Sequence, residues 1–586
     1  MTAKVQRRKR VERVERRRKK PSFMLRRRVL VSGLGMLFLA VIASAFERQV
    51  MEKNFLRTEG ERRHLRVSEI PARRGMILDR NGEPLAVSTP VATVWGDPRQ
   101  LVDQPQAVRA LAGALGINGT ELMARLKAKR ERAFLYLKRR IGPKETAAVK
   151  RIIAQHRLRG VGLESEYQRF YPSGEIFGHV IGFTDVDDRG IEGMELAYDS
   201  WLRAKPGKRR VIQDGHRRVV AEVERIKPAR HGRHLTLSID RRLQFLAHRE
   251  LVRAVNKHQA VAASAVVLDV ETGEVLAMVN QPTYNPNAKL RGKESARRNR
   301  ALTDVMEPGS TVKPLVVAAA LEAGLVGPRA PIDTNPGTLR VGPNVVKDIR
   351  NYGRLNTMGV ITKSSNVGAV KLALRMRKSV LWRLYHRLGF GRSTGIKFPG
   401  ETPGQLRHFR DWRAFEHATL AFGYGLSVTT LQLAQAYGVL AADGIKRPVS
   451  LLKRPEHPAA ERILSATTAR RVRAVLETVV SAKGTARLAA IAGYRVGGKT
   501  GTTKKAIRGG YSARRYQAVF AGIAPASRPR FVMVVMVDEP RGKDYYGGKV
   551  AAPVFAKVTE GALRLFNVPP DNPGATLLLA GVGGRR

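Results

Sequence analysis

The chain of 586 residues contains no cysteine, which excludes disulfide bonds and thiolate metal sites. Its 12 histidines form no H-E-x-x-H or comparable metal-ligand spacing, and no glycine-rich phosphate-binding loop is present. Acidic residues are scarce: 49 Asp and Glu stand against 106 Lys and Arg, a formal net charge of +57. We therefore expect a strongly basic protein that uses no metal and no cofactor.

The basic excess is not matched by any recognisable nucleic-acid-binding motif. A basic surface also attracts anionic lipid headgroups and carboxylate-bearing glycans. A general arginine bias, spread over a solvated surface, explains the charge equally well. We predict that nucleic acid is not a partner.

Long apolar runs are also rare, but residues 29–46 (VLVSGLGMLFLAVIASAF) carry no charge and are long enough to cross a bilayer. Residues 1–28 before them are dense in Lys and Arg, so the positive-inside rule places this basic tail in the cytoplasm. Ala43-Ser44-Ala45 matches a signal-peptidase site, which is the alternative. The long basic region and the apolar span reaching Glu47 favour a retained membrane anchor.

The segment 47–230 is predicted to form a stalk and a pedestal outside the membrane. Residues 47 to about 70 are charged, and we expect them to be helical. Short apolar runs then alternate with turns marked by Gly and Pro, and a charged helical stretch is expected near 121–157. The pattern indicates an irregular α+β domain without a catalytic cluster. Its expected role is to hold the following domain away from the membrane and to bind partners.

The segment 231–566 has the pattern of a second α+β domain. Its strands SAVVLDV and EVLAMVN meet at a tight turn, and the strands AVFAGIAP and FVMVVMVDEP lie near its end, before a last helix near 550–566. Strands at both ends with helices between them predict an antiparallel sheet covered by helices on both faces. Residues 567–586 contain three prolines early and a Gly/Arg end, and we predict disorder there.

Three short motifs within this second domain carry its chemistry. Ser310 and Lys313 form S-x-x-K, Ser364-Ser365-Asn366 forms S-x-N, and Lys499-Thr500-Gly501-Thr502 forms K-T-G-T. Each motif alone is weak evidence. Together, in this order, they are typical of active-site serine enzymes that open amide bonds ending in, or imitating, D-Ala-D-Ala.

The surroundings of Ser310 favour a helix that starts there. Pro308-Gly309 predict a turn, and Pro314 is tolerated only within the first turn of a helix, so the helix begins at about Ser310. The hydroxyl then lies at the positive end of the helix dipole, and Lys313 shares its face. A second S-x-x-K at Ser450–Lys453 is followed by prolines that break a helix, so we interpret it as structural.

The motif residues have complementary expected roles. Ser310 is the nucleophile, and Lys313 is the base that removes its proton, which requires a pKa lowered by desolvation or by nearby positive charge. Ser364 relays a proton to the leaving amine, and Asn366 holds the substrate amide. The alternative for Ser364-Ser365 is a simple helix cap.

The third motif is expected to bind the substrate. Lys499, Thr500 and Thr502 would hold its terminal carboxylate, and the N–H groups of Ser310 and Thr502 would form the oxyanion hole. Gly501, like the glycines before Lys499, suits an edge strand that a peptide backbone approaches closely.

Upstream motifs extend the pattern over nearly the whole chain, from about residue 25 to about 567. They are Arg74-Gly75-Met76-Ile77, Asp79-Arg80-Asn81-Gly82, Arg169-Phe170-Tyr171-Pro172 and the run GIEGMELAYDSWL. On these motifs the chain resembles the class B penicillin-binding proteins, and most of all their septal peptidoglycan transpeptidases in Gram-negative bacteria. Elongation-type relatives typically have S-x-D as the second motif, so Asn366 favours a role in division.

The resemblance implies an inner-membrane enzyme with a periplasmic catalytic domain of the penicillin-binding or serine β-lactamase-like fold. It would cross-link peptidoglycan stem peptides and be inhibited by β-lactams. Alternatives are an elongation transpeptidase and a D,D-carboxypeptidase; a β-lactamase, a β-lactam receptor and a catalytically inactive division scaffold fit less well. Residues 47–230 show no glycosyltransferase motif, so a polytopic lipid II polymerase and other division proteins are the expected partners.

Overall fold

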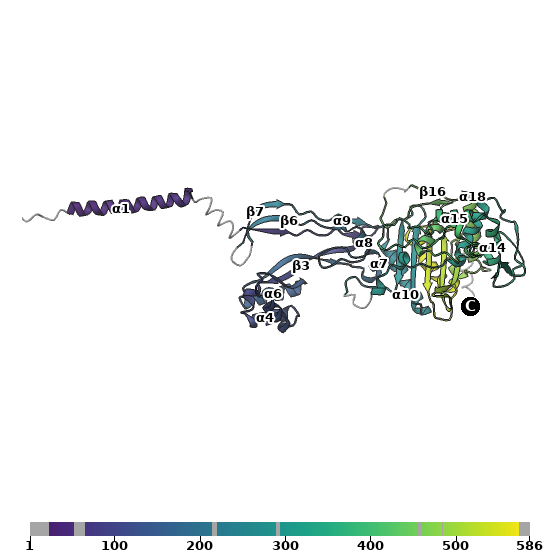
Figure 1. Cartoon of the computed structure of the whole chain (residues 1–586), viewed down its shortest axis with the longest axis horizontal. Coiled ribbons are helices and arrows are strands. Elements are labelled where there is room, and N and C mark those ends of the chain that lie inside the picture. The colour runs from purple at the N-terminus through teal and green to yellow at the C-terminus, as the bar shows by residue number, and fades with distance from the viewer. Residues whose placement is uncertain are drawn as a thin grey trace, which may run out of the picture. The chain divides into compact units, whose positions relative to one another are not determined.

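The computed structural model describes residues 23–51, 65–213, 219–288, 294–454, 459–482 and 484–572. The chain divides into two compact units. The first comprises residues 1–70 with 208–228, and the second comprises residues 71–207 with 229–586. Figure 1 follows the elements of both along the chain.

The first unit contains the apolar helix and a small sheet. Helix α1 spans Phe23–Phe46 and continues into a π-helical turn at Glu47–Met51, and this stretch is long and apolar enough to cross a membrane. The sheet has the order β1-β6-β7, formed by Leu65–Ile70, Gly207–Gln213 and Val219–Lys227. The prediction of a helical stalk to about residue 70 is therefore wrong at β1, while residues 52–64 lie outside the described residues. Strand pairing with β6 outweighs the helical preference of this charged segment.

The second unit begins with a lobe built around the long strand β3. The sheet order is β4-β3-β2-β8, and β5 pairs with β3 from Val87 to Gly96. Its strands are β2 Ile77–Leu78, β3 Pro84–Gly96, β4 Leu135–Ile141, β5 Val161–Phe170 and β8 Leu235–Thr236. Its helices are α3 Pro98–Leu101, α4 Pro105–Ala114, α5 Gly119–Ala128 and α6 Pro143–Gln155.

The helices of this lobe pack on β3 and β4 around a hydrophobic core of their own, which includes Val94, Leu111, Leu126 and Ile141. The predicted helical stretch near 121–157 is interrupted by β4, whose alternating buried Leu135 and Leu137 are typical of a strand. The sequence predicts a helix here because three charged residues, Lys138, Arg139 and Arg140, follow the leucines and resemble the polar face of a helix.

A buried ion-pair network joins the upstream motifs to one another. Both carboxylate oxygens of Glu195 are engaged, by Nε of Arg74 at 2.7 Å and by Nε of Arg169 at 2.6 Å. The side chains of Arg74 and Glu195 are completely buried, and that of Arg169 is 1% exposed. Arg74 also pairs with Asp199 at 2.8 Å. These motifs therefore have a structural role, connecting β5 to the segment that holds the short helices α8 (Gly193–Ala197) and α9 (Asp199–Leu202).

The domain that carries the three catalytic motifs is built on a five-stranded antiparallel sheet with the order β10-β9-β19-β18-β17. The strands are β9 Ala262–Asp269, β10 Val275–Gln281, β17 Gly497–Ile507, β18 Gly510–Ala524 and β19 Phe531–Asp538. The larger helices are α10 Arg241–His258, α12 Lys313–Glu322, α14 Asn366–Arg375, α15 Lys378–Leu388, α17 Thr430–Ala441, α18 Ala466–Val480 and α20 Ala552–Leu565. Smaller elements are α11 Arg300–Thr303, α13 Gly359–Lys363, α16 Ala414–Leu420, α19 Gly547–Val550, β11 Pro331–Asp333, β12 Thr338–Val341, β13 Asn344–Lys347, β14 Arg354–Asn356, β15 Ile445–Lys446 and β16 Glu461–Arg462; the short helix α7 Gly178–Ile181 lies earlier in the chain, between β5 and α8.

Helices cover both faces of this sheet, as neighbouring residues of β19 demonstrate. Val532 lines a cavity together with residues of α17, whereas the sulfur of Met533 contacts the hydroxyl of Thr559 on α20. Successive side chains of a strand point to opposite faces, so α17 and α20 lie on opposite sides. The predicted α+β fold, with an antiparallel sheet between helices, is confirmed.

The end of the chain differs in part from its prediction. Residues 567–572 were expected to be disordered, yet the backbone N–H of Asn572 donates to Gly493 and the carboxylate of Asp571 accepts from the N–H of Arg495. These contacts hold the segment against the residues that precede β17. The rest of the predicted tail, residues 573–586, lies outside the described residues.

Candidate active site

Ser310 lies in a tight turn that leads directly into a buried helix. Residues Gly309–Val312 form a 3-10 turn, and α12 begins at Lys313 with Pro314 in its first turn. The α-helix therefore starts three residues later than predicted, because the 3-10 turn takes up the first residues. Ser310 is half-buried, whereas Lys313 is completely buried.

Glycine at position 501 allows the edge strand β17 to approach the turn that carries Ser310. A Cβ atom on Gly501 would lie 2.9 Å from the carbonyl oxygen of Pro308 and 3.0 Å from a methyl carbon of Thr311. On Gly498 it would lie 2.4 Å from the ring of Phe520. The prediction attributed these glycines to an approaching peptide, but packing inside the domain already requires them.

Lys313 is held by the S-x-N motif. Its Nζ donates to the side-chain oxygen of Asn366 at 2.7 Å, to Oγ of Ser364 at 3.2 Å and to the carbonyl of Ser364. Ser364 has a φ of 56°, a left-handed conformation that non-glycine residues adopt mainly at constrained or functional positions. The backbone N–H of Lys313 donates to the carbonyl of Ser310, but within the described residues no hydrogen bond joins Nζ of Lys313 to Oγ of Ser310.

Lys499, on β17, also contacts the hydroxyl of Ser364. Its Nζ lies 3.0 Å from Oγ of Ser364 and 3.0 Å from the carbonyl oxygen of Thr500, and the lysine is fully buried. Ser364 therefore bridges two lysines of different motifs. The hydroxyl of Thr502 accepts from the N–H of Gly547 at 3.0 Å, which leaves its own hydrogen free to donate.

Burial lowers the pKa of both lysines. Desolvation lowers the pKa of Lys313 well below its usual value, the positive charge of Lys499 lowers it further, and Asp348 opposes these effects. Desolvation also lowers the pKa of Lys499, to about 7. A neutral Lys313 can accept a proton from a serine hydroxyl, which a charged ammonium cannot.

Asp348 supports the S-x-N motif and was not found by sequence reasoning. Its carboxylate accepts from the hydroxyl of Ser365 at 2.6 Å and from the backbone N–H groups of Asn366 and Val367, the second at 3.1 Å. Ser365 caps α14 by accepting from the N–H of Gly368. The helix-cap interpretation thus holds for Ser365, while Ser364 points at the two lysines. Asp348 directly follows β13 and belongs to no recognisable sequence motif. Its role becomes apparent only from its position beside the N-terminus of α14.

The second S-x-x-K, Ser450 with Lys453, does not contribute to the active site. Ser450 forms no helix with Lys453: its Oγ bonds to the backbone of Leu452, and Nζ of Lys453 donates to the carbonyl of Arg80. The S-x-x-K at this position is structural, as predicted. Within the described residues no group of three or more His, Asp and Glu side chains gathers to bind a metal.

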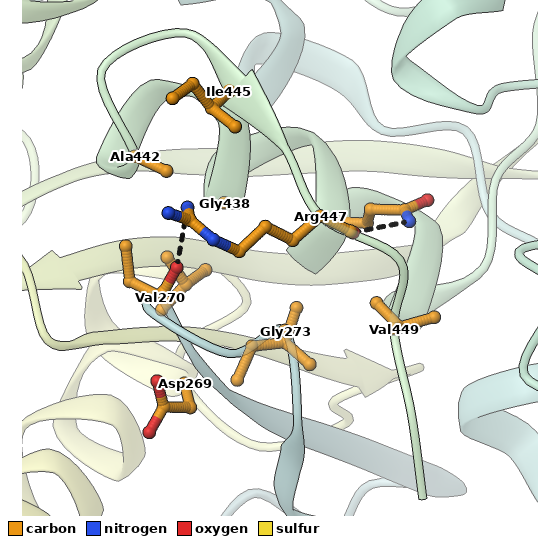
Figure 2. A pocket seen from close by; sticks show the side chains of 11 residues that line it. Asp269, Val270, Gly273, Gly438, Ala442, Ile445, Arg447 and Val449 are labelled. Atoms are coloured by element: carbon orange, nitrogen blue, oxygen red, sulfur yellow. Dashed lines mark hydrogen bonds between the residues drawn. The ribbon is translucent and has the colours of Figure 1, made fainter. Parts of the chain in front are cut away.

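A small cavity between β9, β19 and α17 lies apart from these motifs. Figure 2 shows Arg447 extended across it, with its guanidinium donating to the carbonyl of Val270 at 3.1 Å. The cavity measures ≈ 20 Å³, room for about one water molecule. None of its lining residues belongs to the three motifs, so it is not a substrate site.

Two family models match the chain downstream of the apolar helix. The penicillin binding protein transpeptidase domain matches residues 263–560, and the penicillin-binding protein dimerisation domain matches residues 69–237. The chain belongs to the class B penicillin-binding proteins. The three motifs around Ser364 all lie inside the range of the transpeptidase model.

Relatives within the family extend over nearly the whole chain. The peptidoglycan D,D-transpeptidase FtsI of Escherichia coli K12 is 43% identical over 556 residues, which cover 94% of this chain and 93% of the relative. The transpeptidase domain of penicillin-binding protein 3 from Burkholderia pseudomallei is 43% identical, with a TM-score of 0.53 over 57% of this chain and 97% of that chain. A peptidoglycan synthetase from Bifidobacterium adolescentis is 28% identical, with a TM-score of 0.68 over 87% and 98%.

Proposed function

We propose that this protein is a serine-type peptidoglycan D,D-transpeptidase that cross-links stem peptides at the division septum and is acylated by β-lactams. One observation carries the proposal: Oγ of Ser364 contacts both buried lysines, Lys313 at 3.2 Å and Lys499 at 3.0 Å, and Lys313 directly follows the turn that contains Ser310. A hydroxyl between two amines of lowered pKa is suited to pass a proton between a nucleophile and a leaving group.

The acylation step uses Ser310, Lys313 and Ser364. Neutral Lys313 takes the hydroxyl proton of Ser310 as Oγ attacks the carbonyl carbon of the penultimate D-Ala. The C–N bond to the terminal D-Ala then breaks, and the leaving amine receives a proton through Ser364. An amine of a second stem peptide attacks the resulting ester and loses a proton to Lys313. The ester C–O bond breaks, Lys313 passes that proton to Oγ of Ser310, and the new peptide bond is complete.

Substrate binding is assigned to the third motif. Charged Lys499, with the hydroxyls of Thr500 and Thr502, would hold the terminal carboxylate of the donor peptide. Gly501 leaves no side chain between β17 and the Ser310 turn, so the N–H groups of Ser310 and Thr502 could both face the developing oxyanion. Asn366 keeps one N–H for the substrate amide, because its side-chain oxygen is taken by Lys313 and its other N–H donates to the carbonyl of Lys347.

This assignment predicts a bell-shaped pH profile for acylation by benzylpenicillin. The rate falls on the acid side, where Lys313 gains a proton and no longer acts as a base. It falls on the alkaline side above about pH 7, where Lys499 loses the charge that binds the carboxylate. Stopped-flow or quench acylation rates between pH 5 and 9 test this. The variant Lys499→Arg keeps its positive charge at all these pH values, so its acylation rate should not fall above about pH 7. A rate that still falls there would contradict the assignment of Lys499.

The position in the cell is proposed from charge. Residues 1–28 carry the basic tail, and the apolar part of α1, residues 29–46, follows it, so the positive-inside rule places the N-terminus in the cytoplasm and the catalytic domain in the periplasm. We propose domain limits of 47–230 for the stalk and pedestal and 231–566 for the transpeptidase domain. A polytopic lipid II polymerase and other division proteins are the proposed partners, since residues 47–230 contain no glycosyltransferase motif.

Intact-mass spectrometry of the full chain in detergent with benzylpenicillin tests the proposed function. We expect an adduct that persists for hours and maps to Ser310. An adduct that turns over within seconds would indicate a β-lactamase instead. A D-Ala-D-Ala pentapeptide, incubated with and without an amine acceptor, distinguishes the last alternative: a carboxypeptidase releases D-Ala without forming the cross-linked product.

A further inference from the structure

Glu307 lies three residues before Ser310, and its carboxylate joins two segments that are distant from it in sequence. Its Oε1 accepts from the backbone N–H of Gly425 at 2.8 Å and from the hydroxyl of Tyr511 at 2.9 Å. Gly425 belongs to the loop 421–429 between α16 and α17, and Tyr511 lies near the start of β18, beside the turn from β17. One carboxylate oxygen therefore connects the nucleophile's turn, this loop and the β17–β18 hairpin.

The backbones of these three segments are in direct contact. The N–H of Gly309 donates to the carbonyl of Gly423 at 3.1 Å, and a Cβ atom on Gly423 would lie 2.2 Å from the carbonyl oxygen of Gly309. A Cβ atom on Gly309 would lie 2.4 Å from a methyl carbon of Thr503 on β17. Gly309 directly precedes Ser310. Thr503 directly follows Thr502. A shift of either segment would therefore move one residue of the assigned oxyanion hole.

Two tyrosines pack beside the carboxylate. The rings of Tyr424 and Tyr511 meet edge to face with their centroids 5.4 Å apart, and the hydroxyl of Tyr424 accepts from the backbone N–H of Lys504 at 3.4 Å. Oε2 of Glu307 is buried and has no hydrogen-bond partner within the described residues. Burial raises the pKa of the Glu307 carboxyl, and the two donors to Oε1 oppose that rise. A buried oxygen without a partner is costly, and such groups call for a functional explanation.

We propose that Glu307 is a positioning residue for acylation, which sets the distance between the N–H groups of Ser310 and Thr502 by tying the nucleophile's turn to the hairpin through Tyr511. This inference rests on the proposed transpeptidase function. Donors of an oxyanion hole stabilise the tetrahedral transition state more than the bound ground state. Loss of the tie should therefore lower the rate constant of acylation, k2, and leave the noncovalent affinity for penicillin unchanged.

Stopped-flow acylation of the full chain in detergent tests the proposal, because the dependence of the rate on the concentration of a fluorescent penicillin separates Kd from k2. We expect Tyr511→Phe to lower k2 about fivefold and Glu307→Ala to lower it about thirtyfold, since hydrogen bonds to a charged acceptor are lost, with Kd unchanged in both. Glu307→Gln keeps an acceptor oxygen and should restore k2 to within about fivefold of the unchanged protein. Tyr511→Phe should have no further effect when added to Glu307→Ala, because both remove the same hydrogen bond.

Tyr516→Phe is the matched control. It removes the hydroxyl of another tyrosine of β18, which donates to the carbonyl of Ala513 at 3.2 Å, and should change neither k2 nor Kd. A raised Kd with unchanged k2 would make Glu307 a ligand contact and overturn the proposal. Additive effects of the changes at Glu307 and Tyr511, or an equal effect of Tyr516→Phe, would overturn it as well.

Two further results are distinguishable from these. If circular dichroism shows that Glu307→Ala does not fold, Tyr511→Phe still decides, because it removes one hydroxyl from a side chain that is 47% exposed. An unchanged k2 in Tyr511→Phe would then overturn the proposal. If the proposed function itself fails, the unchanged protein forms no penicilloyl adduct, and no rate constant of acylation exists to be compared.

Discussion

Replacement of Ser310 with alanine is expected to abolish covalent labelling by benzylpenicillin. The variant keeps Lys313, Ser364 and Lys499 but has no oxygen that can form the acyl ester, so no adduct should be detected after hours of incubation. The measurement is intact-mass spectrometry of the full chain, with gel labelling by a fluorescent penicillin as a second readout.

Ser450→Ala is the matched control, because it removes the serine of the other S-x-x-K. Its hydroxyl contacts only the backbone of Leu452 within the described residues, so labelling should equal that of the unchanged protein. An adduct that survives the change at Ser310, or one that is lost with the change at Ser450, would contradict the assignment of the nucleophile.

Replacement of Glu195 with alanine is expected to destabilise the protein by roughly 3–5 kcal/mol. The change leaves the buried guanidinium of Arg169 without its carboxylate partner and Arg74 with Asp199 alone, and an uncompensated buried charge is costly. Urea denaturation followed by circular dichroism measures the free energy of unfolding. Glu195→Gln retains an acceptor oxygen and should have a smaller effect.

Glu560→Ala is the control for this prediction. Glu560 pairs with Arg564 on the surface of α20, where the arginine side chain is 76% exposed. Exposed pairs of this kind contribute about 0.2–1 kcal/mol, so the loss should be small. Equal losses from Glu195→Ala and Glu560→Ala would mean that the network does not stabilise the pedestal lobe as its burial implies.

The fold was predictable where a local pattern was strong. The apolar helix, the hydrophobic strands β9, β10, β18 and β19 and the helix after Ser310 follow from runs of neighbouring residues. Prediction failed at β1 and β4, where charged residues favoured a helix. Both strands exist because a partner strand, far away in sequence for β1, supplies their hydrogen bonds.

The sequence by itself determined which groups carry the chemistry, because S-x-x-K, S-x-N and K-T-G-T are short strings whose residue types define their reactivity. The tertiary structure alone decided how those groups behave. Lys313 and Lys499 have lowered pKa values because the fold buries them and brings them to one hydroxyl, that of Ser364. Asp348 supports the site, and Glu195 joins two arginines, only because distant segments meet. Burial and electrostatic environment depend on every atom nearby in space, so residues adjacent in the chain do not specify them.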